Sequence, residues 1–332
     1  MREFTSVWGQ HLKDFFEYKN LCGYKYDKGV DVLIQFDIYY KNLDINELKL
    51  TRDIIEPFLY LKDGGRISTL CWKASIIRQF GEYVVRNNIL DKVYKIPTIY
   101  KKGETEFIPY ILSKQEIIDI IAYISNYIAV IPKGGIEPYC NTVNATSTVF
   151  KVLISTGMRI GEVLNLRLKN VDFDNDLFVV LEAKNDNQRL VPFSKTLKEE
   201  LLNYIGRTPF KIKNDDHLFK IAIDRNVNTC LCSRYLRKAL DFLDNKYKFT
   251  KKPRIHDFRH TYAVMALTQL QQTEVNVNLS LTYLSDYLGH KSLKETQKYL
   301  WLTPSLFEET KNQMNSYTSF IKEIYDGEKY DD

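Results

Sequence analysis

Apolar and aromatic positions recur at three- and four-residue spacings between Trp8 and about Ile96. This spacing is the period of an amphipathic helix. Glycines at positions 23, 29, 64 and 65 interrupt the pattern and divide it into separate helices. Thr51 and Ser68 are residue types that commonly begin a helix. We therefore predict a compact all-α domain whose helices cover residues 5–22, 28–42, 51–62 and 67–88.

The helical period stops at residues 97–110, where prolines, a glycine and mixed charges follow one another. This composition is typical of an exposed linker. A new helix is expected after it, with Ser113 as the N-cap and Glu116 at the third helical position. Residues 131–147 are rich in Pro, Gly, Asn and Thr, and we expect them to form a loop insertion.

The second half of the chain combines helical segments with two short strand-like runs. Helices are expected around residues 146–157 and 159–167, with a turn between them. Residues 177–183 and 189–194 predict two strands joined by a polar hairpin loop. From residue 196 onward the pattern is again mostly helical.

These elements predict a mainly α fold. An N-terminal helical bundle covers residues 1–98, and a linker covers residues 99–110. A mixed α+β domain with a small antiparallel sheet covers residues 111–332 and ends in an amphipathic tail helix at about 305–325. A chain of 332 residues is also long enough for two domains.

Composition excludes several classes of protein. The hydrophobic share of 44% and the charged share of 27% are ordinary for a globular protein. No apolar run is long enough for a membrane span, and the mixed N-terminus is unlike a signal peptide. The five cysteines contain no C-x-x-C pair. We therefore expect reduced thiols in a cytoplasmic protein without a structural metal.

The net charge of +5 is compatible with nucleic-acid binding but does not identify it. Basic residues are spread over both halves of the chain, so any DNA contact must come from local patches. The densest stretch contains Lys246, Lys248, Lys251, Lys252, Arg254 and Arg259. A solvated surface explains such a run as well as a nucleic-acid contact does.

Two short segments place arginine where it can bind a phosphate. In T-G-M-R-I-G-E, Arg159 follows a glycine turn at the start of a helix, where an oxyanion is favoured. In H-D-F-R-H, His256, Arg259 and His260 share one helix face, so this face can bind phosphate and transfer a proton. Ordinary ion pairs are the alternative for both segments, the second one with Asp257.

A third segment, L-G-H-K-S-L-K-E-T-Q-K-Y-L, places His290 nine residues before Tyr299. Because the chain has 23 tyrosines, this spacing alone means little. Together, however, the segments resemble the tyrosine recombinase (phage integrase) family over most of residues 110–302. The pattern of that family is T-G-x-R, a β-hairpin lysine, H-x-x-R, and then L-G-H followed by a tyrosine, and all four occur here in that order.

The hairpin A-K-N-D-N-Q-R-L-V-P supplies the lysine of this pattern, Lys184, with Arg189 five residues later. Ala183 and Asn185 replace the glycines that usually flank the lysine. Arg259 and His290 are separated by 31 positions along the chain, which is more than in shorter family members. We expect a lengthened helix and loop around residues 268–280.

The resemblance implies a DNA-cutting and DNA-rejoining enzyme with a 3′-phosphotyrosyl intermediate. The catalytic residues that it implies are Arg159, Lys184, His256, Arg259, His290 and Tyr299. The two arginines would hold the non-bridging oxygens, and His290 would donate a further hydrogen bond.

The same resemblance assigns the proton transfers. His256 would act as the base for the Tyr299 phenol, and Lys184 would protonate the leaving 5′-oxygen. Glu162 and His260 receive supporting roles, Glu162 in orienting Arg159 and His260 as a hydrogen-bonded core group. The covalent link keeps the bond energy, so neither ATP, a metal nor another cofactor is implied.

The implied partner is double-stranded DNA with specific sites, bound by a homotetramer on paired sites. The N-terminal bundle resembles the core-binding domain of the family and would clamp the duplex, with affinity dominated by phosphate contacts. Candidate phosphate contacts are Lys25, Lys28, Lys62, Arg66, Lys73, Arg78, Lys251, Lys252 and Arg254. The aromatic side chains expected in the bundle core are Phe15, Phe36, Tyr39 and Phe80.

Further expectations follow from the resemblance. Accessory proteins are the remaining candidate partners, and a location on the bacterial nucleoid in the cytoplasm is expected. No small domain precedes Trp8, so we expect no separate arm-site reader. The tail helix would cap its own domain or dock on a neighbouring subunit.

Four functions stay open from the sequence. The run Y-L-S-D-Y-L-G-H and the T-P-S-L after Tyr299 are similar to recombinases carried by mobile elements, which favours integration, excision or transposition. A chromosome or plasmid dimer resolvase is the alternative within the family. A type IB topoisomerase and a catalytically inactive DNA-binding regulator are the alternatives outside it.

Overall fold

The computed structural model describes residues 4–24, 26–60, 67–97, 108–126, 136–181, 188–272, 277–290 and 292–302. The chain divides into two compact units, Met1–Phe107 and Ile108–Asp332. Helices dominate both units and the strands form small antiparallel sheets, which confirms the predicted fold class. The sequence predictions that lie outside the described residues concern Lys25, Lys62, Arg66, Lys184, most of the linker and the tail helix at 305–325.

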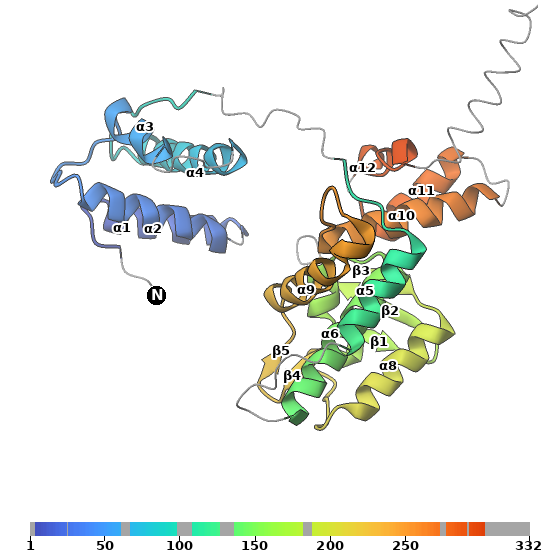
Figure 1. Cartoon of the computed structure of the whole chain (residues 1–332). Coiled ribbons are helices and arrows are strands. Elements are labelled where there is room, and N and C mark those ends of the chain that lie inside the picture. Colours follow the sequence, from blue (N-terminus) through green and yellow to red (C-terminus); the bar gives the residue numbers. More distant parts are fainter. Residues whose placement is uncertain are drawn as a thin grey trace, which may run out of the picture. The chain divides into compact units, whose positions relative to one another are not determined.

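The first unit is a helical bundle (Figure 1), and its core is rich in aromatic side chains. Its helices are α1 (Gly9–Leu21), α2 (Asp27–Lys41), α3 (Arg52–Tyr60) and α4 (Ile67–Arg86). Phe15, Phe36 and Phe80 are fully buried as predicted, whereas Tyr39 is only partly buried against the core. Edge-to-face contacts join these rings, such as that between Trp8 and Phe80 at 5.4 Å between centroids. This geometry is the one that aromatic quadrupoles favour.

The second unit begins with two long helices and a small sheet (Figure 1). In chain order these elements are α5 (Lys114–Asn126), α6 (Ile136–Thr156), α7 (Ile160–Asn165), η2 (Leu168–Asn170), β1 (Val171–Asp172), β2 (Leu177–Leu181), β3 (Gln188–Pro192) and α8 (Lys195–Arg207). The predicted capping box is present, because Ser113 and Glu116 exchange backbone-to-side-chain hydrogen bonds of 2.7 and 3.2 Å.

A second hairpin and a group of helices complete this unit. They are β4 (Lys220–Ala222), β5 (Arg225–Asn226), α9 (Thr229–Tyr247), α10 (Ile255–Gln272), α11 (Val277–Leu288), α12 (Leu293–Gln297) and η3 (Leu300–Leu302). The β4–β5 hairpin was not predicted from the sequence, since its strands are only three and two residues long. Within the described ranges, none of the helices has the length and apolar character needed to cross a bilayer.

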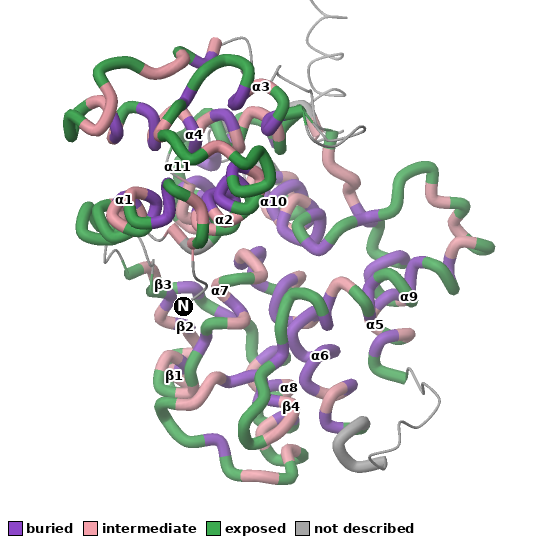
Figure 2. The backbone as a smooth tube through the Cα atoms, turned by 90° about the vertical axis from the view of Figure 1, so that its left-hand side faces the viewer, coloured by how far each residue is buried: buried purple, intermediate pink, exposed green. Residues whose placement is uncertain are grey.

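Helix α6 corrects the prediction of a loop at 131–147, because residues 136–147 are helical. Buried positions are dense along α6, which lies beside α5 (Figure 2). Two of its small polar side chains have partners on other elements: the Asn141 amide donates to the carbonyl of Ile221 at 2.9 Å, and the Ser147 hydroxyl lies 2.6 Å from that of Ser125. Burial and these contacts therefore override the low helix propensity of residues such as Asn and Ser.

The three-stranded sheet, in the order β1-β2-β3, presents the predicted hairpin. β2 pairs with β3 antiparallel from Leu177 opposite Pro192 to Leu181 opposite Gln188. Phe178 and Val191 lie directly opposite each other and are both buried, so one face of the sheet closes the hydrophobic core. This register places Arg189 on β3, next to the predicted hairpin loop.

Candidate active site

A tight turn between α6 and α7 positions the first predicted arginine. Gly157 follows the last residue of α6 with φ of +61°, a conformation that glycine adopts without strain. Arg159 is the N-cap of α7, and its backbone N–H donates to the Glu162 carboxylate at 2.8 Å. The arginine therefore lies at the helix start that the sequence predicted, with its direction set by the preceding turn.

We expect Gly157→Ala to destabilise the second unit strongly. A Cβ at this position would lie 2.3 Å from the Tyr262 ring, and the left-handed backbone adds strain. The combined cost is on the order of 2–4 kcal/mol, measurable by urea unfolding. Gly161→Ala is the matched control, because a Cβ there meets nothing within 4 Å. That control is expected to stabilise helix α7 by about 0.5–1 kcal/mol. Equal effects of the two substitutions would contradict the steric explanation.

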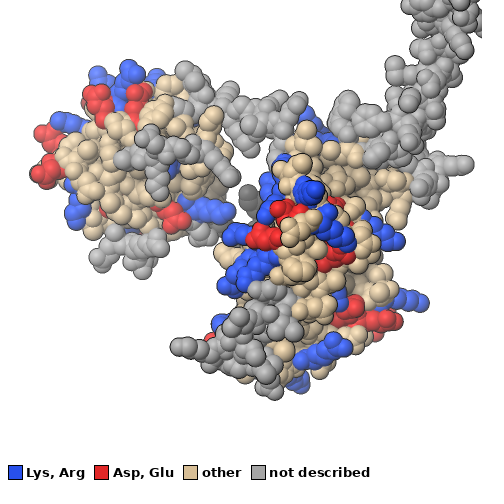
Figure 3. All heavy atoms as spheres, in the orientation of Figure 1, with Lys and Arg blue, Asp and Glu red and all other residues tan. Residues whose placement is uncertain are grey.

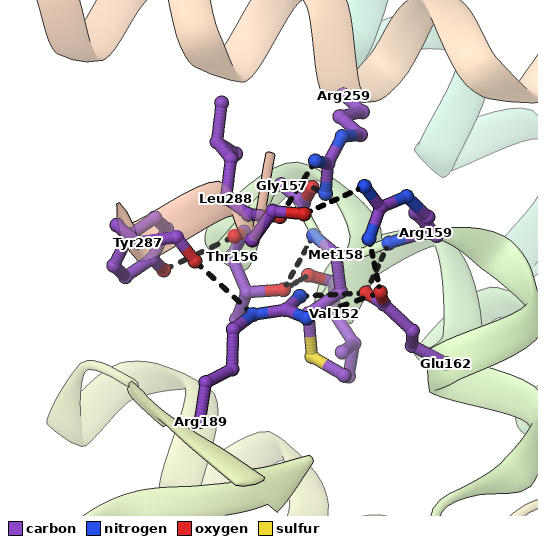
Figure 4. A network of polar contacts seen from close by, with 11 residues as sticks. Val152, Thr156, Gly157, Met158, Arg159, Glu162, Arg189, Arg259, Tyr287 and Leu288 are labelled. Atoms are coloured by element: carbon purple, nitrogen blue, oxygen red, sulfur yellow. Dashed lines mark hydrogen bonds and ion pairs between the residues drawn. The ribbon is translucent and has the colours of Figure 1, made fainter. Parts of the chain in front are cut away.

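Glu162 joins two arginine side chains. Arg159 donates to its carboxylate at 2.7 Å, and Arg189 from β3 donates to both carboxylate oxygens at 3.1 and 2.7 Å. Figure 4 shows this carboxylate between the two guanidinium groups. Burial alone raises the pKa of Glu162, but the contacts with Arg189 and then Arg159 lower it to about 2. The supporting role predicted for Glu162 is therefore compatible with its geometry.

Backbone carbonyls hold both predicted catalytic arginines. Arg259, only 2% exposed, donates to the carbonyls of Gly157 at 2.9 Å and Leu288 at 2.7 Å (Figure 4). Arg159 donates to the carbonyl of Gly289 at 2.9 Å. Burial, and then the charge of Arg159, lower the pKa of Arg259 to about 10, so it stays charged at neutral pH. The two guanidinium groups are thus oriented by the turns of α6 and α11.

Tyr299 lies inside this site. It follows α12, is 4% exposed, and packs in a small apolar cluster formed by α10 and α11. The Nδ1 atom of His260 lies 3.1 Å from its hydroxyl oxygen, and the His290 ring is stacked on it at 6.1 Å between centroids. His290 is itself fixed by a 2.7 Å hydrogen bond to Thr296. The phenol therefore has two imidazoles as neighbours.

The environment opposes early ionisation of the phenol. Burial raises the pKa of Tyr299, while the charges of Arg259 and Arg159 lower it only in part. Burial also lowers the pKa values of His260 and His290 to about 4, so both rings are neutral at neutral pH. A neutral imidazole beside a protonated phenol can accept its proton.

These two histidines predict a loss of stability in mild acid. In the unfolded chain they titrate near pH 6.5, and in the folded chain at about 4. Between these values the unfolded state binds more protons, so the unfolding free energy falls as the pH falls from about 7 to 4. The full shift corresponds to about 3 kcal/mol for each ring, but both rings are only partly buried, so solvent screening reduces the expected loss to on the order of 1 kcal/mol for each. Urea unfolding at several pH values measures this loss, and His260→Gln or His290→Gln is expected to reduce it. An unchanged pH dependence in both variants would contradict the prediction.

The structure brings together most of the predicted site. Arg159, Arg259, His290 and Tyr299 converge, with Glu162 and His260 in contact with them. His256 contacts the His260 ring edge-on, at 4.6 Å between centroids. The predicted general acid, Lys184, lies outside the described residues.

Sequence reasoning assigned no role to two residues of the network. Arg189 was noted only as part of the hairpin pattern, and Tyr287 was not singled out. The Tyr287 hydroxyl donates to the carbonyl of Thr156 at 3.0 Å, and its own carbonyl accepts from Arg189 at 3.1 Å. One signal in the sequence could have identified Arg189. It is a charged residue on a strand expected to have one buried face, and a charged side chain in such a position usually needs a partner.

A model of the phage integrase family matches residues 136–305, which contain every residue of this site. The chain belongs to the phage integrase family. It is accordingly a tyrosine recombinase, and the predicted resemblance is confirmed.

Three curated relatives of this family member match between 81% and 90% of its length. An integrase/recombinase of Sinorhizobium fredii is 26% identical over 90% of this chain and 93% of its own. An integrase/recombinase protein of Methanocaldococcus jannaschii is 29% identical over 81% and 77%. The tyrosine recombinase XerC of Rickettsia canadensis is 24% identical over 90% and 92%.

Solved recombinase structures share the fold of this family member. XerH bound to its difH substrate, a post-cleavage complex, superposes with a TM-score of 0.60 at 17% identity, covering 84% of this chain and 76% of that one. The Tn1549 transposon integrase with circular intermediate DNA gives 0.58 at 16% identity, covering 89% and 94%.

Five of the predicted DNA contacts that lie in the described ranges, Lys73, Arg78, Lys251, Lys252 and Arg254, have partners within their own units. Lys73 lies over the Phe58 ring at 5.1 Å, and Arg78 donates to the carbonyl of Pro97 at 3.3 Å. Lys252 pairs with Asp241 at 2.6 Å. Lys and Arg are interspersed with Asp and Glu on the face of the second unit drawn in Figure 3. Exposed pairs of this kind are worth little, so phosphates can compete for them. Their DNA contacts remain predictions.

Proposed function

We propose that this chain is a site-specific recombinase that cuts and rejoins DNA through a covalent bond between Tyr299 and a 3′-phosphate. The observation that supports the proposal most is the position of the Tyr299 phenol, 3.1 Å from His260 and beside the buried Arg259. A nucleophile, a proton acceptor and a charged anion-binding group thus share one small site. The chain also contains all six predicted catalytic residues, which argues against a catalytically inactive regulator.

The reaction follows from this arrangement. The Tyr299 oxygen attacks the scissile phosphorus, a P–O bond forms, and the bond to the 5′-oxygen breaks. Arg159 and Arg259 hold the non-bridging oxygens, where negative charge grows, and His290 donates a hydrogen bond. The released 5′-oxygen takes a proton, for which Lys184 is the candidate. Attack by a 5′-hydroxyl on the phosphotyrosyl bond reverses the steps and joins the strands.

The proton of the phenol has two candidate acceptors. His256 is the base that the resemblance implies, and it contacts the second candidate, His260, edge-on. Because the Nδ1 atom of His260 is within hydrogen-bond distance of the Tyr299 hydroxyl, the tautomer of His260 with an unprotonated Nδ1 would be the direct acceptor. His256 would then assist this proton transfer through its contact with His260, or would itself act as the base once DNA is bound.

The wider assembly is also part of the proposal. The helical unit Met1–Phe107 would clamp the duplex through its basic side chains, so binding would weaken steeply with salt. Four copies on two paired sites would exchange strands. Both solved neighbours named above carry DNA, which is consistent with a duplex partner.

Covalent trapping tests the chemistry. The full-length protein first selects duplexes from a randomised DNA pool. Copies of the selected duplex, hereafter the trapping duplex, then carry a nick at successive positions, so that a short 5′-hydroxyl fragment is lost after cleavage. We expect a detergent-resistant adduct that retains a label on the 5′ end of the cleaved strand, with the modified peptide containing Tyr299.

Two outcomes would overturn the proposal. Absence of an adduct from every nicked duplex would contradict cleavage, and an adduct on the 5′-phosphate side would contradict the polarity. Joining of two differently labelled duplexes supports recombination. Relaxation of supercoiled plasmid without joining would instead favour the type IB topoisomerase.

For the biological role we propose integration, excision or transposition of a mobile element. The fold shared with the Tn1549 transposon integrase over most of both chains supports it. Dimer resolution is the second candidate, favoured by the XerC relative that matches over 92% of its length. A plasmid with one selected site and a target plasmid without it separate these roles. A mobile-element recombinase joins the two, whereas a dimer resolvase recombines only two copies of the site.

A further inference from the structure

Arg189 is the best-connected residue of the site that the proposed mechanism does not use. Its side chain is 13% exposed, and it binds both oxygens of Glu162. Its Nε atom donates to the carbonyl of Tyr287, at the end of α11, at 3.1 Å. One guanidinium therefore links strand β3, helix α7 and helix α11 (Figure 4).

Each of these links leads to a group that would touch the phosphate. Glu162 holds the backbone N–H and the guanidinium of Arg159. The residues after Tyr287 supply the carbonyls that orient Arg259 and Arg159. Arg189 thus contacts both of the groups, Glu162 and the end of α11, that hold the side chains of Arg159 and Arg259.

We propose that Arg189 is a positioning residue for DNA cleavage, acting through Glu162 on Arg159 and through the end of α11 on Arg259. This inference rests on the proposed function. A planar guanidinium can bind both carboxylate oxygens and a third acceptor at once, which a lysine ammonium on a flexible chain cannot reproduce. Misplacement of a catalytic group by about 1 Å can cost about 100-fold in rate.

The first experiment measures single-turnover cleavage of the trapping duplex at saturating protein. We expect Arg189→Gln to slow adduct formation about 10- to 100-fold with little change in DNA affinity, and Arg189→Lys to slow it by a smaller factor. Arg225→Gln, at an exposed position on β5, is the matched control and should be unaffected. Glu162→Gln combined with Arg189→Gln should slow cleavage by less than the product of the two single losses, since both substitutions remove the link between Arg189 and Glu162.

A second substrate separates positioning from a folding defect. A methylphosphonate at the scissile position has no charged non-bridging oxygen, so it needs the arginine pair less. We expect Arg189→Gln to slow cleavage of this substrate less than about threefold. An equal loss on both substrates would overturn the inference, as would a wild-type rate for Arg189→Gln. If Arg189→Gln does not fold, Arg189→Lys gives the same comparison. Absence of any adduct from the wild-type protein refutes the proposed function instead.

Discussion

Tyr299→Phe is expected to abolish the covalent adduct with the trapping duplex while leaving DNA binding intact. The substitution removes only the hydroxyl that would attack phosphorus, and no other oxygen replaces it. The ring can keep its place in the apolar cluster and its stacking on His290. Loss of the hydrogen bond to His260 costs about 0.5–1.5 kcal/mol in stability. The effect on cleavage is therefore complete, and the effect on folding is small.

Gel-shift affinity, unfolding midpoint and detergent-resistant adduct are the three measurements. Tyr283→Phe is the matched control, because Tyr283 is an exposed tyrosine on α11, 58% accessible. The control is expected to form adduct at the wild-type rate. An adduct in the Tyr299→Phe protein would mean that another residue is the nucleophile, and the mechanism proposed here would fail.

Arg259→Lys is expected to produce the second-largest effect, a loss of about 100- to 1,000-fold in cleavage rate. Lysine keeps the positive charge but cannot donate to the carbonyls of Gly157 and Leu288 in the same plane while holding a phosphate oxygen. The rate loss would therefore exceed any loss of affinity. Arg207→Lys, at the exposed end of α8, is the control for the same exchange.

Arg259→Ala adds a loss of stability to this defect. It leaves two buried carbonyls without their donor, at about 1–3 kcal/mol each. Urea unfolding of Arg259→Lys and Arg259→Ala thus shows how much of each loss in cleavage rate comes from lower stability and how much from the loss of the catalytic group. A lysine variant that cleaves at the wild-type rate would show that position 259 does not bind the phosphate during catalysis.

The elements that could be predicted from the sequence are those with a strong local signal. The period of the first four helices and the Ser113 capping box depend on neighbouring residues alone, and both are found. Helix α6 could not be predicted at its start, because Asn141 and Ser147 are stabilised by partners on other elements. Local propensity contains no information about those partners.

The residues of the candidate site also fall into two groups, those that a local motif predicts and those whose role depends on distant partners. Motifs at characteristic spacings predicted Arg159, Arg259, His290 and Tyr299. The structure brings these four residues together. The proximity of His260 to the phenol was not predicted, since helix periodicity places His256 and His260 on one face without deciding which is nearer. Nor was the role of Arg189, because its partners lie 27 and 98 positions away in the chain.

The burial of Tyr299 has a consequence for chemical labelling. Reagents that nitrate or iodinate phenols react with accessible and ionised rings, and this ring is neither in the free protein. Among the 23 tyrosines it would be one of the slowest to be modified. A survey of reactive side chains on the free protein would thus pass over the proposed nucleophile, because burial keeps its phenol covered and protonated.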